Sequence, residues 1–252
     1  SKQRINNLQF FEDVKIDTQR GENPDLIDIL TTVTEKPTGS FTVGAGFSSV
    51  ENLIFTTSIA QDNLFGNGHR VNLTASLSSI RADFNISLTE PRLFDSEISA
   101  GIDAFNRDED FLSFDAKSSG GGLRLGKNIT EFESLSLGYR FENVEVTGVS
   151  AADTSEFLKN ETRTTSRVSP VYSFDSRDNF LNPSQGWRHV VAFEFAGLGG
   201  AKFTRSSYDI TYYHPLVGKL VGAAHGKINF AEGYSGDTLP SFERYFMGGP
   251  TS

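Results

Sequence analysis

The feature that most constrains this chain is a two-residue alternation of apolar and polar side chains that begins near Ser40. Val71, Leu73, Ala75 and Leu77, for example, are separated by single Asn, Thr and Ser residues. Other stretches with the same alternation are 41–47, 84–88, 135–141, 191–195 and 208–212. Successive side chains of a strand point to opposite faces, so the pattern predicts strands with one apolar and one polar face. No helix-period segment competes with it. The sequence therefore predicts an all-β, antiparallel fold with about eleven strands.

The length of these runs separates two kinds of all-β protein. Runs of about 9–12 residues recur here, whereas strands of globular proteins average about five or six residues. Transmembrane barrel strands need about 9–11 residues, with compact connections on one side and larger ones on the other. The hydrophobic content of only 37% fits this architecture because every second residue would face a wet lumen. The pattern favours an antiparallel transmembrane β-barrel, and a soluble β-sandwich or β-solenoid stays open as an alternative.

Composition and motifs exclude most kinds of chemistry. The formal net charge of −9 argues against nucleic acid as a partner, because phosphates require a basic face. The chain has no cysteine for disulfides, thiolate zinc sites or a nucleophile. Gly121–Asn128 lacks the Ser or Thr that ends a phosphate-binding loop, and the four histidines lack metal-ligand spacing. We therefore expect no enzyme activity, no catalytic residues, no metal and no cofactor.

The first 38 residues differ from the remainder. Residues 2–8 could be the last turns of a helix, and two strand-like runs follow at 13–17 and 25–33. Between them, residues 20–25 (Arg-Gly-Glu-Asn-Pro-Asp) form a cluster of turn formers. A helix end and a hairpin are too small to make their own core, so we expect this segment to be the tail of a larger α+β module.

Several segments together resemble one family, the outer-membrane barrel insertases typified by BamA. In order along the chain they are 36–41 (Lys-Pro-Thr-Gly-Ser-Phe), 61–68 (Gln-Asp-Asn-Leu-Phe-Gly-Asn-Gly), 89–94 (Thr-Glu-Pro-Arg-Leu-Phe), 175–178 (Asp-Ser-Arg-Asp) and 239–252. The resemblance covers essentially the whole chain, and five motifs in register are more specific than any one of them.

The resemblance implies a domain organisation. Residues 1–38 would be the C-terminal part of the last periplasmic POTRA domain. Residues 39–252 would be the N-terminal part of an outer-membrane barrel, with about eleven of the family's sixteen strands, ending in the sixth extracellular loop. The sixth-loop segment would include Arg244, Tyr245, Phe246, Gly248 and Gly249. In the family a Val-Arg-Gly segment follows, which this chain does not reach, so we expect a fragment of a longer barrel.

The resemblance also implies a function, which is the insertion of client β-strands into the outer membrane of a Gram-negative bacterium at a weak barrel seam. Its partners would be the lipid bilayer, unfolded outer-membrane proteins and accessory assembly lipoproteins. The candidate gate is the first barrel strand, whose two glycines weaken strand pairing. Its residues are Phe41, Thr42, Val43, Gly44, Ala45, Gly46 and Phe47. The glycines could instead relieve crowding in a small-radius bend.

The alternation assigns lipid-facing residues as well. We expect the apolar phase of the strands to face lipid, at Leu73, Phe84, Ile86, Leu137, Phe193, Phe195 and Ile210. Alternative functions within the family are autotransporter assembly and two-partner secretion. A passive porin is an alternative from another class, although it gives no reason for the α+β segment at the start.

Overall fold

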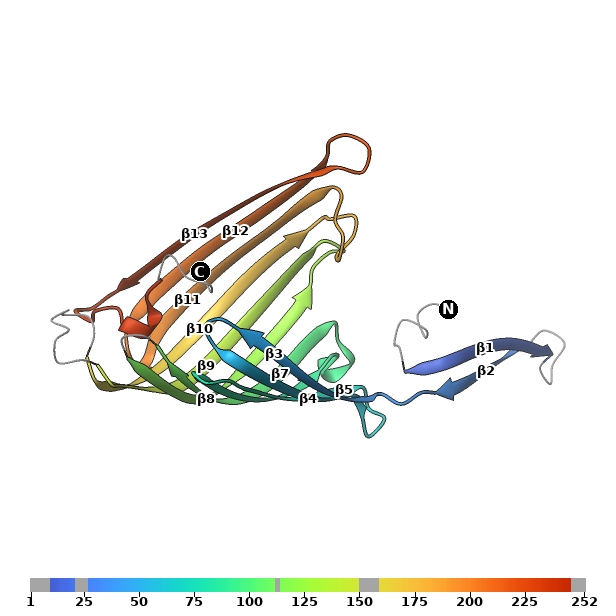
Figure 1. Ribbon diagram of the computed structural model, residues 1–252. Coiled ribbons are helices and arrows are strands. Elements are labelled where there is room, and N and C mark those ends of the chain that lie inside the picture. The colour runs from blue at the N-terminus through green and yellow to red at the C-terminus, as the bar shows by residue number, and fades with distance from the viewer. Residues whose placement is uncertain (1–9, 21–26, 112–113, 150–158, 246–252) are drawn as a thin grey trace.

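The computed structural model describes residues 10–20, 27–111, 114–149 and 159–245, which form two antiparallel sheets (Figure 1). The smaller sheet is a hairpin of β1 (Phe11–Arg20) and β2 (Ile27–Glu35). β1 contains the predicted run 13–17, and β2 contains the described part, 27–33, of the predicted run 25–33. The helix end predicted at 2–8 lies outside the described residues.

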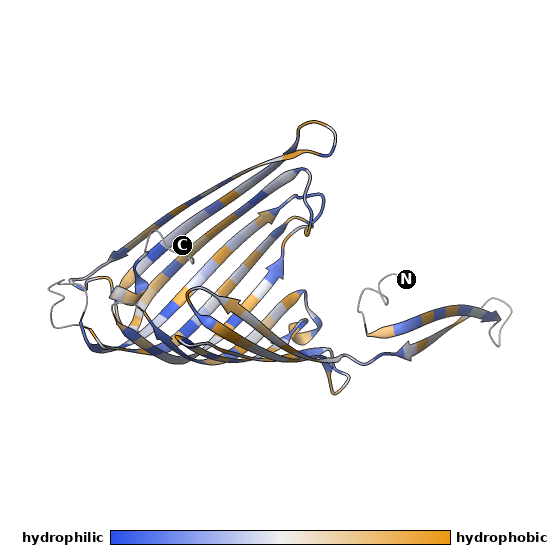
Figure 2. Ribbon diagram, in the orientation of Figure 1, coloured by the Kyte–Doolittle hydropathy of each residue, from blue (hydrophilic) through white to orange (hydrophobic). Residues whose placement is uncertain are grey.

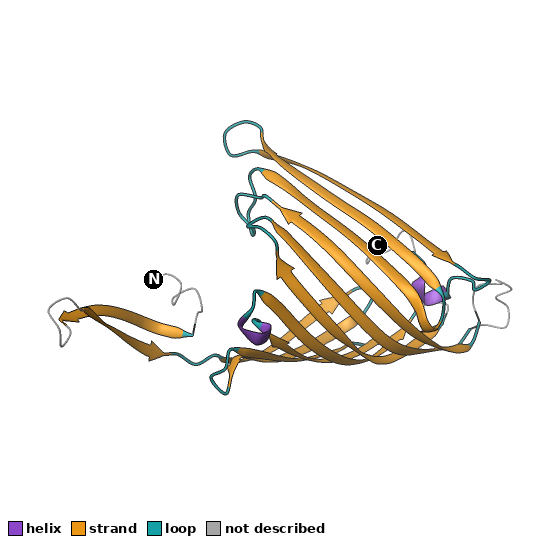
Figure 3. Cartoon of the chain, turned by 180° about the vertical axis from the view of Figure 1, so that it is seen from behind, coloured by secondary structure: helices purple, strands orange, loops and turns teal. Residues whose placement is uncertain are grey.

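The larger sheet contains eleven strands, and every strand pairs with its neighbours in sequence. The strands are β3 (Gly39–Ser48), β4 (Asn52–Leu64), β5 (His69–Leu77), β6 (Arg81–Glu90), β7 (Ile98–Asp110), β8 (Asp115–Asn128), β9 (Glu133–Thr147), β10 (Glu161–Asp175), β11 (Gly186–Gly200), β12 (Phe203–Pro215) and β13 (Val221–Gly233). The predicted all-β antiparallel barrel architecture is confirmed. Seen from behind, the strands form a tilted, strongly curved sheet (Figure 3).

The connections alternate between two ends of this sheet. We call the end where β3 begins, next to the N-terminal hairpin, the proximal end, and the opposite end the distal end. The proximal turns are 65–68, 91–97, 129–132, 176–185 and 216–220. Helical structure among the described residues is limited to two single turns, η1 (Leu93–Asp95) and η2 (Ser241–Glu243). No helix in the described parts of the chain has the length and apolar character required to cross a membrane.

The period-two sequence places different chemistry on the two faces of the sheet, and bands of opposite hydropathy alternate along the strands (Figure 2). We call the face contacted by η2 the inner face and the opposite one the outer face. Directly paired residues of antiparallel strands share a face. On β11, Glu194 is therefore on the inner face with Arg205 of β12, whereas Phe193 and Phe195 are on the outer face.

Apart from Val14 in the hairpin, fully buried apolar side chains among the described residues are few, and they lie near the distal end. One cluster joins Phe114, Val144 and Val146, against which Phe242 packs. A second joins Ala196, Ala201 and Phe203, with Leu239 packed against it. Both clusters involve the segment that follows β13, so this segment folds back onto the inner face. The large apolar side chains of the strands are mostly exposed instead.

Candidate functional site

An ionic cluster on the inner face connects four neighbouring strands to the segment after β13. Its members are Glu142 on β9, Arg167 on β10, Glu194 on β11, Arg205 on β12 and Glu243 in η2. The strand residues lie on the polar phase of the alternation, which brings them to one face. We call these five residues the inner ionic cluster.

Glu243 is the central acceptor of the inner ionic cluster. Its two carboxylate oxygens accept hydrogen bonds from Arg167 Nη1 and Arg205 Nη1, both at 2.6 Å. The second terminal nitrogen of Arg167 donates to Glu142 Oε1 at 2.5 Å. Glu194 Oε2 lies 3.6 Å from Arg167 Nη1 and 3.7 Å from Arg205 Nη1. Each arginine is thus shared by acidic groups from different elements.

The inner ionic cluster differs from a surface ion pair because its charged side chains are buried. Arg167 is 9% exposed, Glu142 5% and Glu243 4%. Burial raises the pKa of Glu243 above its ordinary value, while the charges of Arg167 and Arg205 act in the opposite direction. A buried carboxylate requires paired charges and hydrogen bonds, because its desolvation is costly. The cluster provides these partners only while η2 stays on the inner face.

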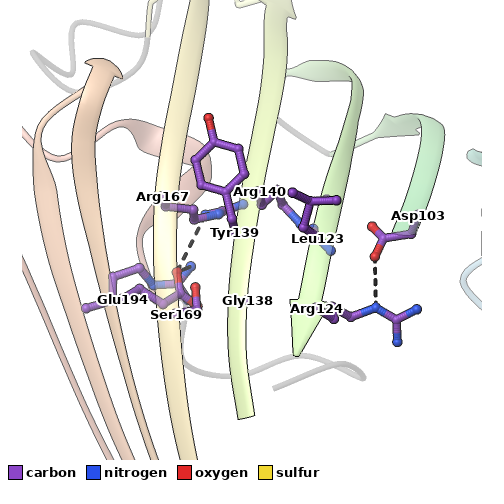
Figure 4. Close-up of a pocket in the computed structure, with 11 residues that line it drawn as sticks. Asp103, Leu123, Arg124, Gly138, Tyr139, Arg140, Arg167, Ser169 and Glu194 are labelled. Carbon is purple, nitrogen blue, oxygen red and sulfur yellow. Dashed lines mark hydrogen bonds and ion pairs between the residues drawn. The ribbon is translucent and has the colours of Figure 1, made fainter. Parts of the chain in front are cut away.

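The neighbouring part of the inner face is polar and open. A cavity of about 370 Å³ lies beside the cluster, and Arg124, Arg140, Arg167 and Asp103 are among its lining residues (Figure 4). Arg124 Nε donates to Asp103 Oδ1 at 2.9 Å across β7 and β8. Further cross-strand pairs on this face are Arg81–Glu109, Arg107–Asp83 and Arg188–Asp209. The inner face therefore resembles a wet, charged surface.

The predicted sixth-loop segment is only partly described. Arg205 lies over the ring of Tyr245, with its guanidinium carbon 4.7 Å from the ring centroid, and its Nε donates to the Tyr245 hydroxyl at 3.3 Å. Arg244 Nε donates to the Leu239 carbonyl at 3.4 Å. Phe246, Gly248 and Gly249 lie outside the described residues. The described part thus contacts the inner face through Glu243 and Tyr245.

The predicted gate residues Phe41, Thr42, Val43, Gly44, Ala45, Gly46 and Phe47 all lie on β3. Within the described residues, β3 pairs with β4 alone and is, like β13, an edge strand of the larger sheet. Phe41, Val43 and Phe47 on its outer face are 69%, 64% and 76% exposed. A Cβ at Gly44 would lie 2.7 Å from Thr56 Oγ1, whereas one at Gly46 would meet no atom within 4 Å. Crowding therefore accounts for the first glycine but not for the second.

The seven residues predicted to face lipid lie together on the outer face. Six of them are exposed, with Leu73 at 39% and Phe84 and Ile86 both at 47%, and Ile210 is half-buried. Their strand pairing places them in phase with one another: Leu73 pairs with Ile86, and Ile210 pairs with His189 next to Val191 and Phe193. Contact with lipid stays a prediction.

Sequence reasoning missed the inner ionic cluster, although one signal was available. On β9 to β12 the polar phase carries Arg140, Glu142, Arg167, Glu194 and Arg205, whereas on β3 to β5 it carries mainly Ser, Thr, Asn and Gly. Charged residues of both signs on the polar phase of adjacent strands indicate ion pairing across the face.

Comparisons with known proteins agree with this architecture. Over 99% of its length, the chain is 28% identical to the outer membrane protein assembly factor BamA of Nitratidesulfovibrio vulgaris and 26% identical to the one of Neisseria meningitidis serogroup B. The chain spans 32% and 34% of those proteins, about a third of their length.

Solved structures show the same fold. The crystal structure of BamA from Haemophilus ducreyi lacking POTRA domains 1–3 superposes with a TM-score of 0.88 at 22% identity, covering 100% of this chain and 52% of that one. CdiB from Acinetobacter baumannii gives a TM-score of 0.54 at 14% identity, covering 99% of this chain and 49% of that one. Residues 63–252, most of the chain, match the model of the Omp85 superfamily domain, and the chain therefore belongs to the Omp85 superfamily.

Proposed function

We propose that this chain forms part of an outer-membrane protein assembly factor, which inserts client β-barrels into the outer membrane of a Gram-negative bacterium. Two relatives that align with nearly the whole chain carry that description. The curved sheet with an apolar outer face and a charged inner face suits an outer-membrane barrel. The hairpin β1–β2 would then be the end of a POTRA domain in the periplasm, next to the proximal end of the barrel.

The observation that carries the mechanism is Gly46 of β3, where a Cβ would meet no atom within 4 Å. In hydrocarbon, each unpaired backbone N–H or C=O costs several kcal/mol, so a client strand needs hydrogen-bond partners before it reaches lipid. A strand whose edge opens can supply them by β-augmentation, which reads the main chain more than the sequence. Gly46 weakens β3 without a packing reason, which favours opening at this strand.

The partners of the proposed function follow from this mechanism. Unfolded outer-membrane proteins would add strands at β3, and the bilayer would contact the outer face, including Leu73, Phe84 and Phe193. Accessory assembly lipoproteins would act from the periplasm. No nucleotide or cofactor is required, because the hydrogen bonds and apolar burial of the client supply the driving force.

The test is a disulfide that closes the seam. In the full-length protein, cysteines replace Val43 and the facing residue of the last barrel strand, and insertion of a client barrel into vesicles is measured under oxidising and reducing conditions. Oxidation should abolish insertion, and reduction should restore it. Normal insertion by protein that is completely cross-linked would contradict gating at β3.

A matched control places the disulfide away from the seam. Ile102 on β7 and Leu123 on β8 pair directly and lie on the outer face. A cross-link between cysteines at these positions should leave insertion unchanged, because this strand pair stays closed in the proposed cycle. Loss of insertion with this cross-link would indicate that the disulfide acts through general rigidity.

The second candidate function is secretion of one class of client, and the fold similarity to CdiB is compatible with it. A dedicated transporter would serve a single soluble substrate and would not insert unrelated barrels. Insertion of several unrelated client barrels by the reconstituted protein would support the assembly function, and insertion of none would favour the transporter.

A further inference from the structure

Strand β10 contains a proline, Pro170, near its middle, although β10 lies between two other strands of the larger sheet. Proline has no N–H group to donate to a ladder, and in sheets it is confined to edge strands, first positions of strands and bulges. A missing ladder bond would be more costly still in hydrocarbon, where water cannot replace it. Pro170 therefore requires a structural reason.

Pro170 makes the two sides of β10 unequal. With β9 the pairing is continuous over residues 161–174 of β10. With β11 the pairing has a gap at Ser169 and Pro170. The strand register places Glu194 and Phe193 opposite these two residues. The missing N–H of Pro170 explains the gap, because paired residues of antiparallel strands exchange N–H···O bonds and the carbonyl of Phe193 loses its donor.

A β-bulge lies next to this gap on its distal side. The register between β10 and β11 shifts between Thr165 and Arg167, and residues 197–199 of β11 lie opposite Ser166 alone. A bulge disrupts the ladder locally and bends the strand that carries it. The backbone pairing of β10 with β11 is thus interrupted twice within residues 165–171, whereas its pairing with β9 is not interrupted there.

Side chains of the inner ionic cluster cross this interrupted junction. Arg167 of β10 and Arg205 of β12 both donate to Glu243 at 2.6 Å, so the carboxylate forms a bridge that passes over β11. Glu194 of β11 contributes less, because its buried Oε2 accepts no hydrogen bond in the described part of the chain. Ser169 and Glu194 also line the cavity of about 370 Å³, so the inner side of the gap borders an open, polar space (Figure 4).

The position of the Glu243 bridge determines which motion it resists. The sheet curves around η2 (Figure 1), so Glu243 lies on the concave face. Flattening of a curved sheet moves the side chains of its concave face apart. Flattening at the β10–β11 junction would therefore separate Arg167 from Arg205 and break their shared contact with Glu243. That loss is opposed strongly, because it leaves a buried carboxylate without a partner.

We propose that the β10–β11 junction is a hinge line of the barrel wall and that Glu243 is the clamp that holds it at its present curvature. With the clamp intact, the strands on both sides of the junction move together. Without it, β3 to β10 rotate as one block about the interrupted ladder, and the sheet flattens there. The hinge is a property of the wall alone and does not depend on the insertion of client barrels.

The test measures distances across the junction by double electron–electron resonance. This chain has no cysteine, so spin labels can be placed on introduced ones in the full-length protein in phospholipid vesicles. The spanning pair is Glu131→Cys with Lys219→Cys, in the exposed turns before β9 and after β12. The control pair is Glu131→Cys with Asn67→Cys, which also spans four strands, β5 to β8, but not the junction.

Glu243→Gln should lengthen and broaden the distance distribution of the spanning pair and leave the control pair unchanged. Glu109→Gln is the matched control variant, because it removes an inner-face ion pair with Arg81 away from the junction, and it should change neither pair. Should Glu243→Gln fail to fold, Glu243→Asp replaces it, since the shorter side chain keeps the charge but cannot reach both arginines. An unchanged spanning distance in folded protein, or equal broadening of both pairs, would overturn the clamp.

The hinge line itself is tested by Pro170→Val in the Glu243→Gln background. Valine restores the N–H group and suits a strand, so the ladder with β11 can close at this position. The spanning distribution should then narrow toward that of the wild type, because the block has lost part of its freedom to rotate. If Pro170→Val leaves the broadened distribution as it is, the gap at Pro170 is only a tolerated irregularity next to a bulge, and the hinge is refuted.

Discussion

Strands β3 to β5 and strands β10 to β12 follow the same alternation, yet different interactions hold them. On the inner face of β3 to β5, the described residues form no ion pair, and Ser58 donates to Asn72 at 3.2 Å. On β10 to β12, Arg167 and Arg205 converge on Glu243, and on the outer face Trp187 stacks on His189 and Tyr212. β3 has 10 residues and β10 has 15. The comparison indicates that side-chain contacts reinforce β10 to β12, whereas β3 to β5 are held mainly by backbone pairing.

The largest expected effect comes from breaking the inner ionic cluster. Arg167→Ala leaves the buried carboxylates of Glu142 and Glu243 without their shared partner, and loss of one member of a buried ion pair costs about 3–5 kcal/mol. The free energy of unfolding in vesicles measures this loss. Arg107→Ala, which removes a partly exposed pair with Asp83, should cost about 0–1 kcal/mol. Similar costs for both variants would refute the special role of the cluster.

The second prediction compares the two faces. Arginine in place of Phe193 or Leu73 should lower the stability of a complete barrel by roughly 2–4 kcal/mol if these residues lie near the bilayer midplane. Thr74→Arg, one residue away on the inner face, should cost far less because its side chain reaches a polar lumen. Urea titration of the reconstituted variants measures the difference. Equal tolerance at both faces would contradict the lipid-facing assignment.

The third prediction concerns β3, the first strand of the side that has no ion pair on its inner face within the described residues. Gly46→Ala adds a methyl group where no atom lies within 4 Å, and removal of a strand glycine should stabilise β3 by about 0.5–1 kcal/mol. Amide hydrogen exchange of β3 should slow, and client insertion should slow with it. Gly138→Ala on the inner face of β9 is the matched control, because its Cβ would meet only ordinary contacts at 3.7 Å or more. Slower insertion in the control alone would argue against a gate at β3.

The smallest expected effect involves the proximal turn between β10 and β11. Asp178 accepts hydrogen bonds from Ser184 and from the backbone of Ser184 and Gln185, which lower its pKa to about 2. A carboxyl group with a depressed pKa stabilises the folded turn above its ordinary pKa of 3.8, and this stabilisation is lost as the pH falls through about 2. Carboxyl NMR titration measures the midpoint. Asp178→Asn should increase local amide exchange in this turn, and protection equal to wild type would contradict the role of the carboxylate.

The sequence predicted the strands and the faces well because both depend on local periodicity. Val71–Leu77 and Val191–Phe195 show which residues share a face without any knowledge of the partner strand. Turn formers such as Asn67-Gly68 and Asn182-Pro183 likewise mark the proximal connections through local backbone preference.

The inner ionic cluster could not be predicted in the same way. Alternation places Arg167 and Glu142 on the polar face, but their contact depends on register, and Glu243 reaches Arg167 from 76 residues away. Nothing local shows that the segment after β13 returns to the inner face. The stacked rings on the outer face of β11 and β12 are an intermediate case. The shared face of Trp187 and His189 follows from the alternation, whereas their stacking with Tyr212 and Tyr208 depends on strand pairing.

The return of Glu243 to the inner face also has a consequence for the order of assembly. Every strand pair of the larger sheet joins neighbours in sequence, so the sheet can grow by one hairpin at a time with small losses of chain entropy. The Arg167–Glu243 contact closes a far longer loop, and the Arg205–Glu243 contact requires β12 to be in place beside β11. The carboxylate can therefore bind both arginines only after β10, β11 and β12 have taken their register, so its burial marks the completion of this part of the sheet.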